Sequence, residues 1–224
     1  MAVTSRRWGP DVDVETTAKA LEEYGAQALA LELDLADRAS IDAALDEIES
    51  RWGAISVLVN NALCDQPGSQ VQLTTVDFDA FEKMIVGEVV NTAYLTRQVL
   101  GLAGATATTV INVGSAAAHN VPRNPIGQGF GWAFSYSATK AALHRLAPFV
   151  QLEYRDRGVR AFTVDPGLVR TEALLERLGD IPGSAPPQLP ADVIDWLAFD
   201  PGADAYLGQY VHAQDLAAEL GWRY

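Results

Sequence analysis

Short apolar, β-branched runs alternate with amphipathic stretches along the whole chain, and this alternation limits the folds open to it. Three of the runs are nearly uninterrupted, as expected for strands that are covered on both faces. Strand–helix–strand alternation implies right-handed crossovers and a parallel sheet between two helical layers. The sequence therefore predicts a three-layer α/β sandwich. The predicted strands are 1–5, 28–34, 55–60, 108–113, 159–164 and 208–213.

The predicted helices have ends that can be read from the sequence. Asp13 is placed to cap a helix that Gly25 ends, and Ser40 is placed to cap a second helix that ends before Gly53. Two longer helices are predicted over about 77–102 and 135–157, with irregular segments at 115–134 and 180–190.

Composition narrows the class of protein. The 224 residues are 49% hydrophobic, which suits one compact domain spanning 1–224. A formal charge of −13 argues against nucleic acid or an anionic membrane as partner. Cys64 is the single cysteine and no run is long enough to span a membrane, so a cytoplasmic protein is expected. The histidines are scattered, which predicts no metal site.

Polar, small or bend-forming residues follow five of the predicted strands. In a parallel sheet, ligands bind outside the carboxyl ends of the strands, so these groups are expected to form one site. They are Ser5-Arg6-Arg7, Asp34-Leu35, Asn60-Asn61-Ala62, Gly114-Ser115 and Asp165-Pro166-Gly167.

Tyr136 and Lys140 are four residues apart in a predicted helix, so both side chains can face one cleft. A nearby lysine ammonium favours phenolate and so lowers the pKa of a phenol toward the range useful for proton transfer. A serine hydroxyl beside the pair could hold a substrate oxygen, and Ser115 follows the neighbouring strand.

These motifs together resemble the short-chain dehydrogenase/reductase family, whose domain is Rossmann-like. The resemblance covers essentially the whole chain, and the order of the motifs makes it specific. The matching pieces are LDLAD at 33–37, LVNNA at 58–62, INVGS at 111–115, YSATK at 136–140 and DPGLVRT at 165–171.

The resemblance implies an NAD(P)-dependent oxidoreductase that interconverts an alcohol and a ketone or aldehyde. It makes Tyr136 the proton donor or acceptor. It implies that Lys140 lowers the pKa of Tyr136 and binds the nicotinamide ribose, and that Ser115 binds the reacting oxygen of the substrate. Arg6 and Arg7 suit a 2′-phosphate, which favours NADP over NAD. The other cofactor-binding residues that the resemblance implies are Asp34, Leu35, Asn60, Asn61, Ala62, Pro166, Gly167 and Thr171.

The chain departs from the family in several places. Glu88 stands where the family usually has a proton-relay asparagine, with Asn91 one turn later, and Leu63 replaces a glycine. The segment between Ser115 and Tyr136 is longer than usual, and its His119 could be catalytic or plain polar surface.

The largest departure is at the N-terminus. Residues 1–7 resemble the family's second strand, so its first strand, glycine-rich turn and first helix are expected to be absent. That helix N-terminus normally holds the cofactor diphosphate. The expected domain is therefore an N-terminally truncated Rossmann-like one that binds the dinucleotide weakly.

Three functions stay open. The leading one is the NAD(P)-dependent oxidoreductase, acting on a small-molecule substrate that is an apolar carbonyl or alcohol. The second is a family-derived nonredox acid–base enzyme, such as an isomerase, cyclase or dehydratase, and the third is a catalytically silent subunit. Apolar residues on the two long helices predict a homodimer or homotetramer.

Overall fold

The computed structural model describes residues 1–6, 14–102, 107–121, 133–179 and 181–224. Its strands are β1 (Ala2–Ser5), β2 (Leu29–Glu32), β3 (Val57–Asn60), β4 (Thr109–Val113), β5 (Arg160–Asp165) and β6 (Tyr210–His212). All their pairings are parallel. The α/β fold with parallel strands is therefore confirmed, and the predicted strands are right to within a few residues.

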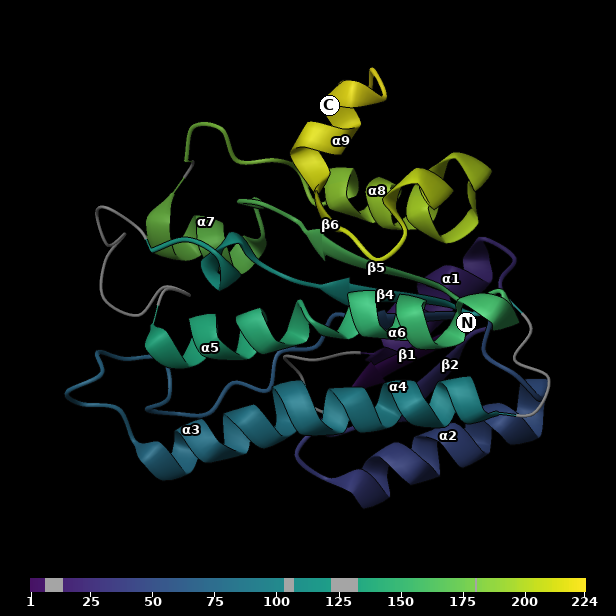
Figure 1. The fold of residues 1–224 in the computed structure, drawn as a ribbon, viewed down its shortest axis with the longest axis horizontal. Helices are drawn as coiled ribbons and strands as arrows, with labels where there is room; N and C mark the ends of the chain where they lie inside the picture. Colours follow the sequence, from purple (N-terminus) through teal and green to yellow (C-terminus); the bar gives the residue numbers. More distant parts are fainter. Residues whose placement is uncertain (7–13, 103–106, 122–132, 180) are drawn as a thin grey trace.

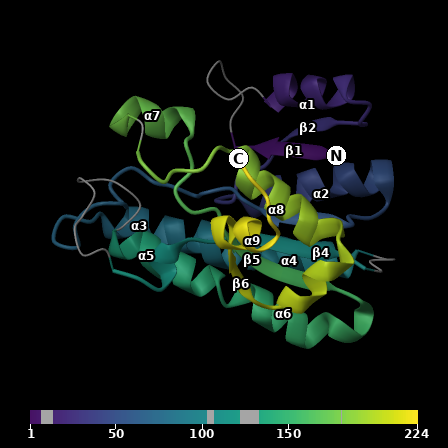
Figure 2. The same ribbon diagram turned by 90° about the horizontal axis from the view of Figure 1, so that it is seen from above.

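The strands form two sheets rather than one. β1 pairs with β2, and β3, β4, β5 and β6 follow one another in a four-stranded sheet. Figure 2 shows β1 and β2 with α1 (Val14–Glu23) at one side of the molecule, away from β4 to β6. A strand and a helix are thus present at the N-terminus, and the expected absence of a first strand–helix unit is not shown by the fold.

Helices cover both faces of the four-stranded sheet (Figure 1). One face packs against α8 (Gln188–Phe199) and α9 (Ala213–Glu219) around Phe162, Val193 and Leu197. The other packs against α4 (Thr92–Gly101) and α6 (Leu146–Tyr154) around Val110 and Ala147. The remaining helices are α2 (Arg38–Trp52), α3 (Phe78–Ile85), α5 (Phe134–Leu143) and α7 (Glu172–Leu178), with short 3-10 turns at Ala116–Ala118, Arg155–Arg157 and Pro201–Tyr206.

The second helix begins earlier than predicted. Asp37, not Ser40, is the N-cap of α2, and its carboxylate accepts a hydrogen bond from the Ala39 N–H. The Ser40 hydroxyl instead accepts from the backbone N–H of Asp34 at 2.9 Å. Ser40 therefore fixes the loop between β2 and α2, and the prediction that it caps the helix is wrong. Asp13, the predicted cap of α1, lies outside the described residues.

Both long helices are interrupted. The first contains a π-helical segment, Val86–Asn91, between α3 and α4. Gly87 lies in this segment, and a Cβ there would be 2.3 Å from the Cys64 Sγ. The glycine thus lets the helix approach the loop after β3 closely. The second long helix divides into α5 and α6 at His144 and Arg145.

Candidate active site

Tyr136 and Lys140 both lie on α5, one turn apart, as predicted. The Lys140 Nζ lies 5.8 Å from the centre of the Tyr136 ring. It donates a hydrogen bond of 3.2 Å to the Val113 carbonyl at the end of β4. Lys140 is buried and Tyr136 half-buried, so α5 fixes the ammonium beneath a phenol that faces partly outward.

Glu88 is the acidic partner of Lys140. Its Oε2 lies 3.3 Å from the Lys140 Nζ, and the exposed fractions of the two side chains are 1% and 5%. Its Oε1 accepts a hydrogen bond from the Cys64 N–H. Both carboxylate oxygens are therefore engaged, as a buried charge requires. The π-helical segment that carries Glu88 is a distortion often found at functional sites.

Asn91, one turn after Glu88, has different partners. Its amide Nδ2 donates to the Leu35 carbonyl at 2.6 Å, and its Oδ1 accepts from the Arg38 Nε at 2.8 Å. Asn91 thereby ties the π-helical segment to the loop after β2. The alternative that Asn91 replaces the relay residue is therefore not supported, since both ends of its amide have structural partners.

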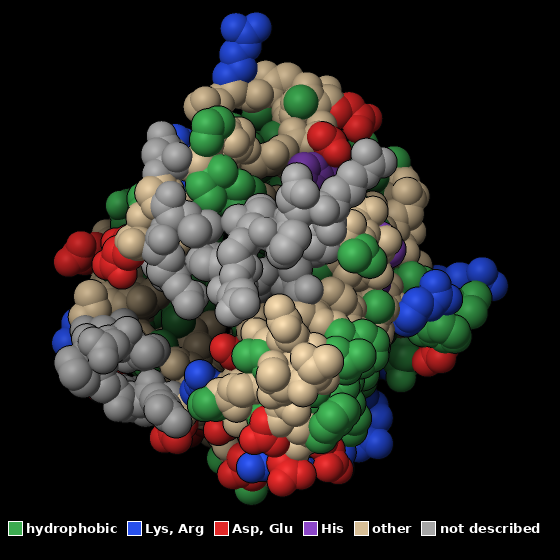
Figure 3. All heavy atoms as spheres, turned by 90° about the vertical axis from the view of Figure 1, so that its left-hand side faces the viewer, with side chains coloured by type: hydrophobic (Ala, Val, Ile, Leu, Met, Phe, Trp, Pro, Cys, Tyr) green, Lys and Arg blue, Asp and Glu red, His purple; other side chains and the backbone are tan. Residues whose placement is uncertain are grey.

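Ser115 follows β4 and caps the 3-10 turn after it. Its Oγ accepts a hydrogen bond of 3.2 Å from the Ala117 N–H, which leaves the hydroxyl hydrogen for another acceptor. This turn packs against α5. Ser115, Tyr136 and Lys140 thus lie near the carboxyl end of β4. Figure 3 views the molecule from the left-hand side of Figure 1, the side on which α5 begins.

A histidine that the sequence analysis missed holds the Ser115 backbone. The Ser115 N–H donates to the His144 Nε2 at 3.1 Å. His144 must then carry its proton on Nδ1, which lies 2.9 Å from the His119 Nε2. Burial and the neighbouring His119 lower the pKa of His144 to about 4, so this imidazole is neutral at pH 7. One signal was available: His144 follows Lys140 by four residues, on the same helix face as Tyr136.

Aromatic and acidic groups complete the surroundings of His144. The Tyr210 ring lies 5.1 Å from the His144 ring and 5.0 Å from the His119 ring. The Tyr210 hydroxyl donates to the Asp165 Oδ2 at 2.6 Å. Burial and this hydrogen bond raise the pKa of Tyr210, which stays a neutral donor. His119 is therefore more than an isolated surface residue, because its ring packs against two others.

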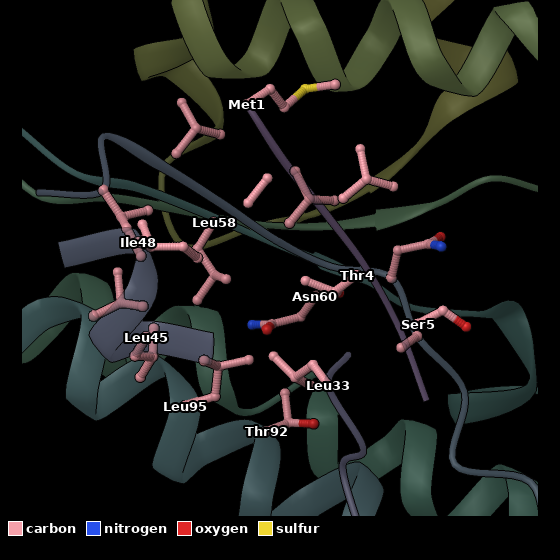
Figure 4. Close-up of a pocket in the computed structure, with 18 of the residues that line it drawn as sticks. Met1, Thr4, Ser5, Leu33, Leu45, Ile48, Leu58, Asn60, Thr92 and Leu95 are labelled. Atoms are coloured by element: carbon pink, nitrogen blue, oxygen red, sulfur yellow. The ribbon is translucent and has the colours of Figure 1, made fainter. Parts of the chain in front are cut away.

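A cavity of about 1170 Å³ lies between β1 and β3 (Figure 4). At the carboxyl end of these strands it is lined by the predicted cofactor-binding residues Arg6, Asp34, Leu35, Asn60, Asn61 and Ala62, and also by Leu63 and Glu88. The structure thus brings these residues together. The triad residues Ser115, Tyr136 and Lys140 are not among its lining residues; Glu88 connects the cavity to Lys140.

Three predicted cofactor residues lie elsewhere, and one is not described. Pro166 and Gly167 follow β5, and the Gly167 N–H donates to the Asp165 Oδ1 at 2.9 Å. The Thr171 hydroxyl accepts from the Leu174 N–H and begins α7. None of the three lines the cavity. Arg7 lies outside the described residues.

The described residues that line the cavity carry little positive charge. Among the charged side chains that line it, the described residues supply one cation, Arg6, against the carboxylates of Asp34, Glu88 and Asp195. One Arg6 N–H is already donated to the Asp65 carbonyl at 3.1 Å. A diphosphate needs convergent N–H groups or positive charge, so the described residues do not by themselves fit the diphosphate of NAD(P).

Comparison with known proteins gives consistent matches. The family model described as short chain dehydrogenase matches residues 10–179. The chain is 31% identical over 207 residues to short chain dehydrogenase mpl6 of Monascus purpureus, covering 91% of this chain and 67% of that protein. It is 29% identical over 164 residues to a sorbitol dehydrogenase of Cereibacter sphaeroides, covering 72% of this chain and 60% of the relative. The chain thus spans about three fifths to two thirds of the length of these curated relatives.

A solved structure shows the same fold. The crystal structure of a short chain dehydrogenase from Burkholderia cenocepacia J2315 in complex with NADP superposes with a TM-score of 0.75. It is 21% identical, and the match covers 94% of this chain and 84% of that one. Among the described residues, no helix is long and apolar enough to cross a membrane.

Proposed function

We propose, since the chain belongs to the short-chain dehydrogenase family, that it is an NAD(P)-dependent oxidoreductase that interconverts an alcohol and a ketone or aldehyde. The observation that carries the proposal is the arrangement of Tyr136 and Lys140 on α5, with the Lys140 ammonium fixed by Glu88 and the Val113 carbonyl. Such fixed geometry is what proton transfer to a bound substrate requires.

Each residue of the site has a role that its contacts support. The Tyr136 hydroxyl gives its proton to the substrate oxygen during reduction and recovers it during oxidation. The Ser115 hydroxyl donates a hydrogen bond to the same oxygen, because its own oxygen is already held by the Ala117 N–H. Lys140 provides the positive charge beneath the phenol. A nicotinamide bound beside Tyr136 would supply or accept the hydride.

The proposed cofactor is NADP rather than NAD. Arg6 at the end of β1 lines the cavity, and its guanidinium has N–H groups beyond the one donated to Asp65. A 2′-phosphate is the group that such an arginine would bind. Phe134 begins α5 exposed, edge-on to Phe81, which supports an apolar substrate beside the triad.

We also propose that β1 and α1 correspond to the second strand and the following helix of the family. The separation of β1 and β3 by a cavity supports this correspondence.

The excess of carboxylates at the cavity favours a second candidate. Ser115, Tyr136 and Lys140 could carry out nonredox acid–base chemistry, such as isomerisation or dehydration, without a dinucleotide. This candidate predicts turnover that needs Tyr136 but no NADP.

The test combines turnover with binding. NADPH oxidation is followed with a panel of apolar ketones and aldehydes, at millimolar NADPH, for the wild type, for Tyr136→Phe and for the control Tyr154→Phe on α6. Tyr136→Phe should lower the rate by at least about 10²-fold with an unchanged circular dichroism spectrum, and Tyr154→Phe should not. Calorimetric titration should show saturable binding of NADP.

The other results are equally informative. Near-normal turnover by Tyr136→Phe would overturn the catalytic assignment. Absence of saturable NADP binding would count against NADP as the cofactor. Turnover of a substrate without NADPH, lost in Tyr136→Phe, would favour the nonredox enzyme.

A further inference from the structure

A chain of hydrogen bonds runs from the Ser115 backbone to the protein surface through two imidazoles. The Ser115 N–H donates to the His144 Nε2 at 3.1 Å, and the His144 Nδ1 lies 2.9 Å from the His119 Nε2. His144 is buried, whereas His119 is exposed. The chain therefore connects a residue of the proposed active site to a side chain that water can reach.

The direction of the first hydrogen bond fixes the protonation of both rings. A backbone N–H can only donate, so the His144 Nε2 accepts and the proton of this neutral ring is on Nδ1. The His144 Nδ1–H donates in turn to the His119 Nε2, so the proton of His119 is on its own Nδ1. Both Nε2 lone pairs are then used. A third proton cannot enter the pair without the loss of one of these two hydrogen bonds.

His144 holds the chain at the point where the pairing of β4 ends. The Gly114 N–H donates to the Val164 carbonyl at 2.7 Å and so continues the ladder between β4 and β5. The next N–H, that of Ser115, leaves the ladder and is donated to His144. The ring fits there because Gly114 has no side chain, since a Cβ would lie 2.2 Å from the His144 Nε2. The placement of Ser115, and of its hydroxyl, therefore depends on the His144 acceptor.

Ionisable side chains from three elements face the pair. The Tyr210 ring of β6 packs against both imidazoles, and its hydroxyl donates to Asp165 at the end of β5. Lys140 of α5 lies one turn before His144. Burial and the neighbouring His119 lower the pKa of His144 to about 4, a shift that Asp165 opposes and Lys140 increases. The buried ring is therefore neutral at pH 7, with an Nε2 that can accept a hydrogen bond.

We propose that His144, with its tautomer fixed by His119, is a positioning residue that holds Ser115 where its hydroxyl meets the reacting oxygen. Each ring must carry its proton on Nδ1 for this. A further proton on the His144 Nε2 would place one N–H against the Ser115 N–H. On the His119 Nε2 it would remove the acceptor that keeps the His144 proton on Nδ1. The inference rests on the proposed function, because it takes Ser115 as the residue that binds the reacting oxygen.

The kinetic test compares variants that keep or remove the acceptors. His144→Gln retains an oxygen that can accept from the Ser115 N–H, and should keep kcat/KM for carbonyl reduction within about 3-fold of the wild type. His144→Leu has no acceptor and should lower kcat/KM at least about 10-fold. The loss should be chiefly in kcat, because the hydrogen bond from the Ser115 hydroxyl strengthens as charge develops on the oxygen. His119→Phe keeps a ring against Tyr210 without the acceptor and should lower kcat/KM about 3-fold, whereas His119→Gln should not.

Binding of NADP separates positioning from a general loss of structure. Neither histidine lines the cavity that brings together the predicted cofactor-binding residues. All four variants should therefore bind NADP, measured by calorimetry, within about 2-fold of the wild-type affinity. Their circular dichroism spectra should be unchanged.

A second measurement needs neither a substrate nor a folded variant. Imidazole nitrogen NMR spectra of the wild type, with its histidines labelled with nitrogen-15, report which ring nitrogen carries the proton. At neutral pH both His119 and His144 should carry it on Nδ1, and the Ser115 amide should be protected from hydrogen exchange. As the pH falls toward the His144 pKa of about 4, this tautomer and the protection of Ser115 should be lost together.

Three results would overturn the proposal. One is wild-type kcat/KM in His144→Leu, and another is a His144 proton on Nε2 at neutral pH, which would exclude the bond from Ser115. The third is a loss of NADP affinity in His144→Leu as large as the loss of kcat/KM, which would indicate general damage to the fold. Absence of NADPH-dependent turnover in the wild type would count against the proposed function instead. The tautomer and exchange measurements would then decide by themselves whether the histidine pair holds Ser115.

Discussion

The Glu88 carboxylate lies 3.3 Å from the Lys140 ammonium, and both side chains are almost wholly buried. Removing one member of such a pair leaves the other charge uncompensated at a buried position. The Cys64 N–H and the Val113 carbonyl complete the hydrogen bonding of the two groups. The pair therefore joins the π-helical segment to α5 and to the end of β4.

Glu88→Gln should destabilise the protein by about 3–5 kcal/mol, because Lys140 loses its buried counter-charge. Urea unfolding measures the change. The control is Glu47→Gln, which breaks the exposed Glu47–Arg51 pair on α2 and should cost less than about 1 kcal/mol. Equal losses of unfolding free energy for the two substitutions would contradict the prediction that the buried Glu88–Lys140 pair stabilises the fold.

Gly87→Ala should destabilise the protein by about 1–3 kcal/mol. The new Cβ would be 2.3 Å from the Cys64 Sγ, so the loop after β3 must shift. Gly101→Ala is the matched control, because a Cβ there meets nothing within 4 Å at the end of α4. It should be neutral or stabilising by up to about 1 kcal/mol. The two variants are compared by their denaturant midpoints, provided that the dependence of unfolding free energy on denaturant is unchanged. Equal destabilisation by the two substitutions would be inconsistent with the close approach at Gly87.

Local sequence signals predicted the individual elements well and their assembly less well. Apolar β-branched runs such as VINV in β4 predict strands correctly, because a strand that is covered by helices on both faces needs apolar side chains on both. The division into two sheets depends on what lies between β1 and β3, which no local pattern encodes. Ser40 was mistaken for a helix cap because Asp37, three residues earlier, is an equally good one.

In the candidate site, the sequence predicts contacts between residues of one helix. It does not predict contacts between residues that are distant in the chain. Tyr136 and Lys140 follow from a four-residue interval. The family resemblance points to Glu88, but the ion pair of Glu88 with Lys140 comes from the packing of the π-helical segment against α5. The bond from Ser115 to His144 joins residues 29 apart in the chain, and Gly114 makes room for it, since a Cβ there would be 2.2 Å from the His144 Nε2.

His144 predicts a pH dependence of stability. Its pKa is lowered from 6.5 to about 4 in the folded protein. In the unfolded chain His144 is therefore protonated below about pH 6.5, whereas in the folded protein it is protonated only below about pH 4. The free energy of unfolding is therefore unaffected by His144 above pH 6.5. It decreases by up to about 3 kcal/mol as the pH falls from 6.5 to about 4.

His144→Gln should reduce the slope of unfolding free energy against pH between 4 and 6.5. Glutamine can still accept from the Ser115 N–H but does not titrate. Urea unfolding at several pH values would measure both slopes, and above pH 7 the two curves should run parallel. An undiminished slope in the variant would show that other groups account for the dependence.

Exposed apolar side chains on the outer surface of the helical layer predict a dimer. Val90, in the segment leading into α4, is 42% exposed, and Phe149 and Leu152 on α6 are 49% and 61% exposed. α4 and α6 cover the same face of the four-stranded sheet (Figure 1). Burying these residues against a second copy would remove apolar surface from water, so we expect a twofold dimer or a dimer of dimers through these helices.

Phe149→Glu should convert that oligomer to a monomer, because a carboxylate would be buried at the interface without a partner. Tyr24→Glu is the control, since Tyr24 is 91% exposed just after α1, and α1 packs against β1 and β2 rather than against the four-stranded sheet. Light scattering at micromolar concentration measures the mass of each protein. A monomeric wild type would refute the dimer, and a Phe149→Glu protein that stays dimeric would place the interface away from α6.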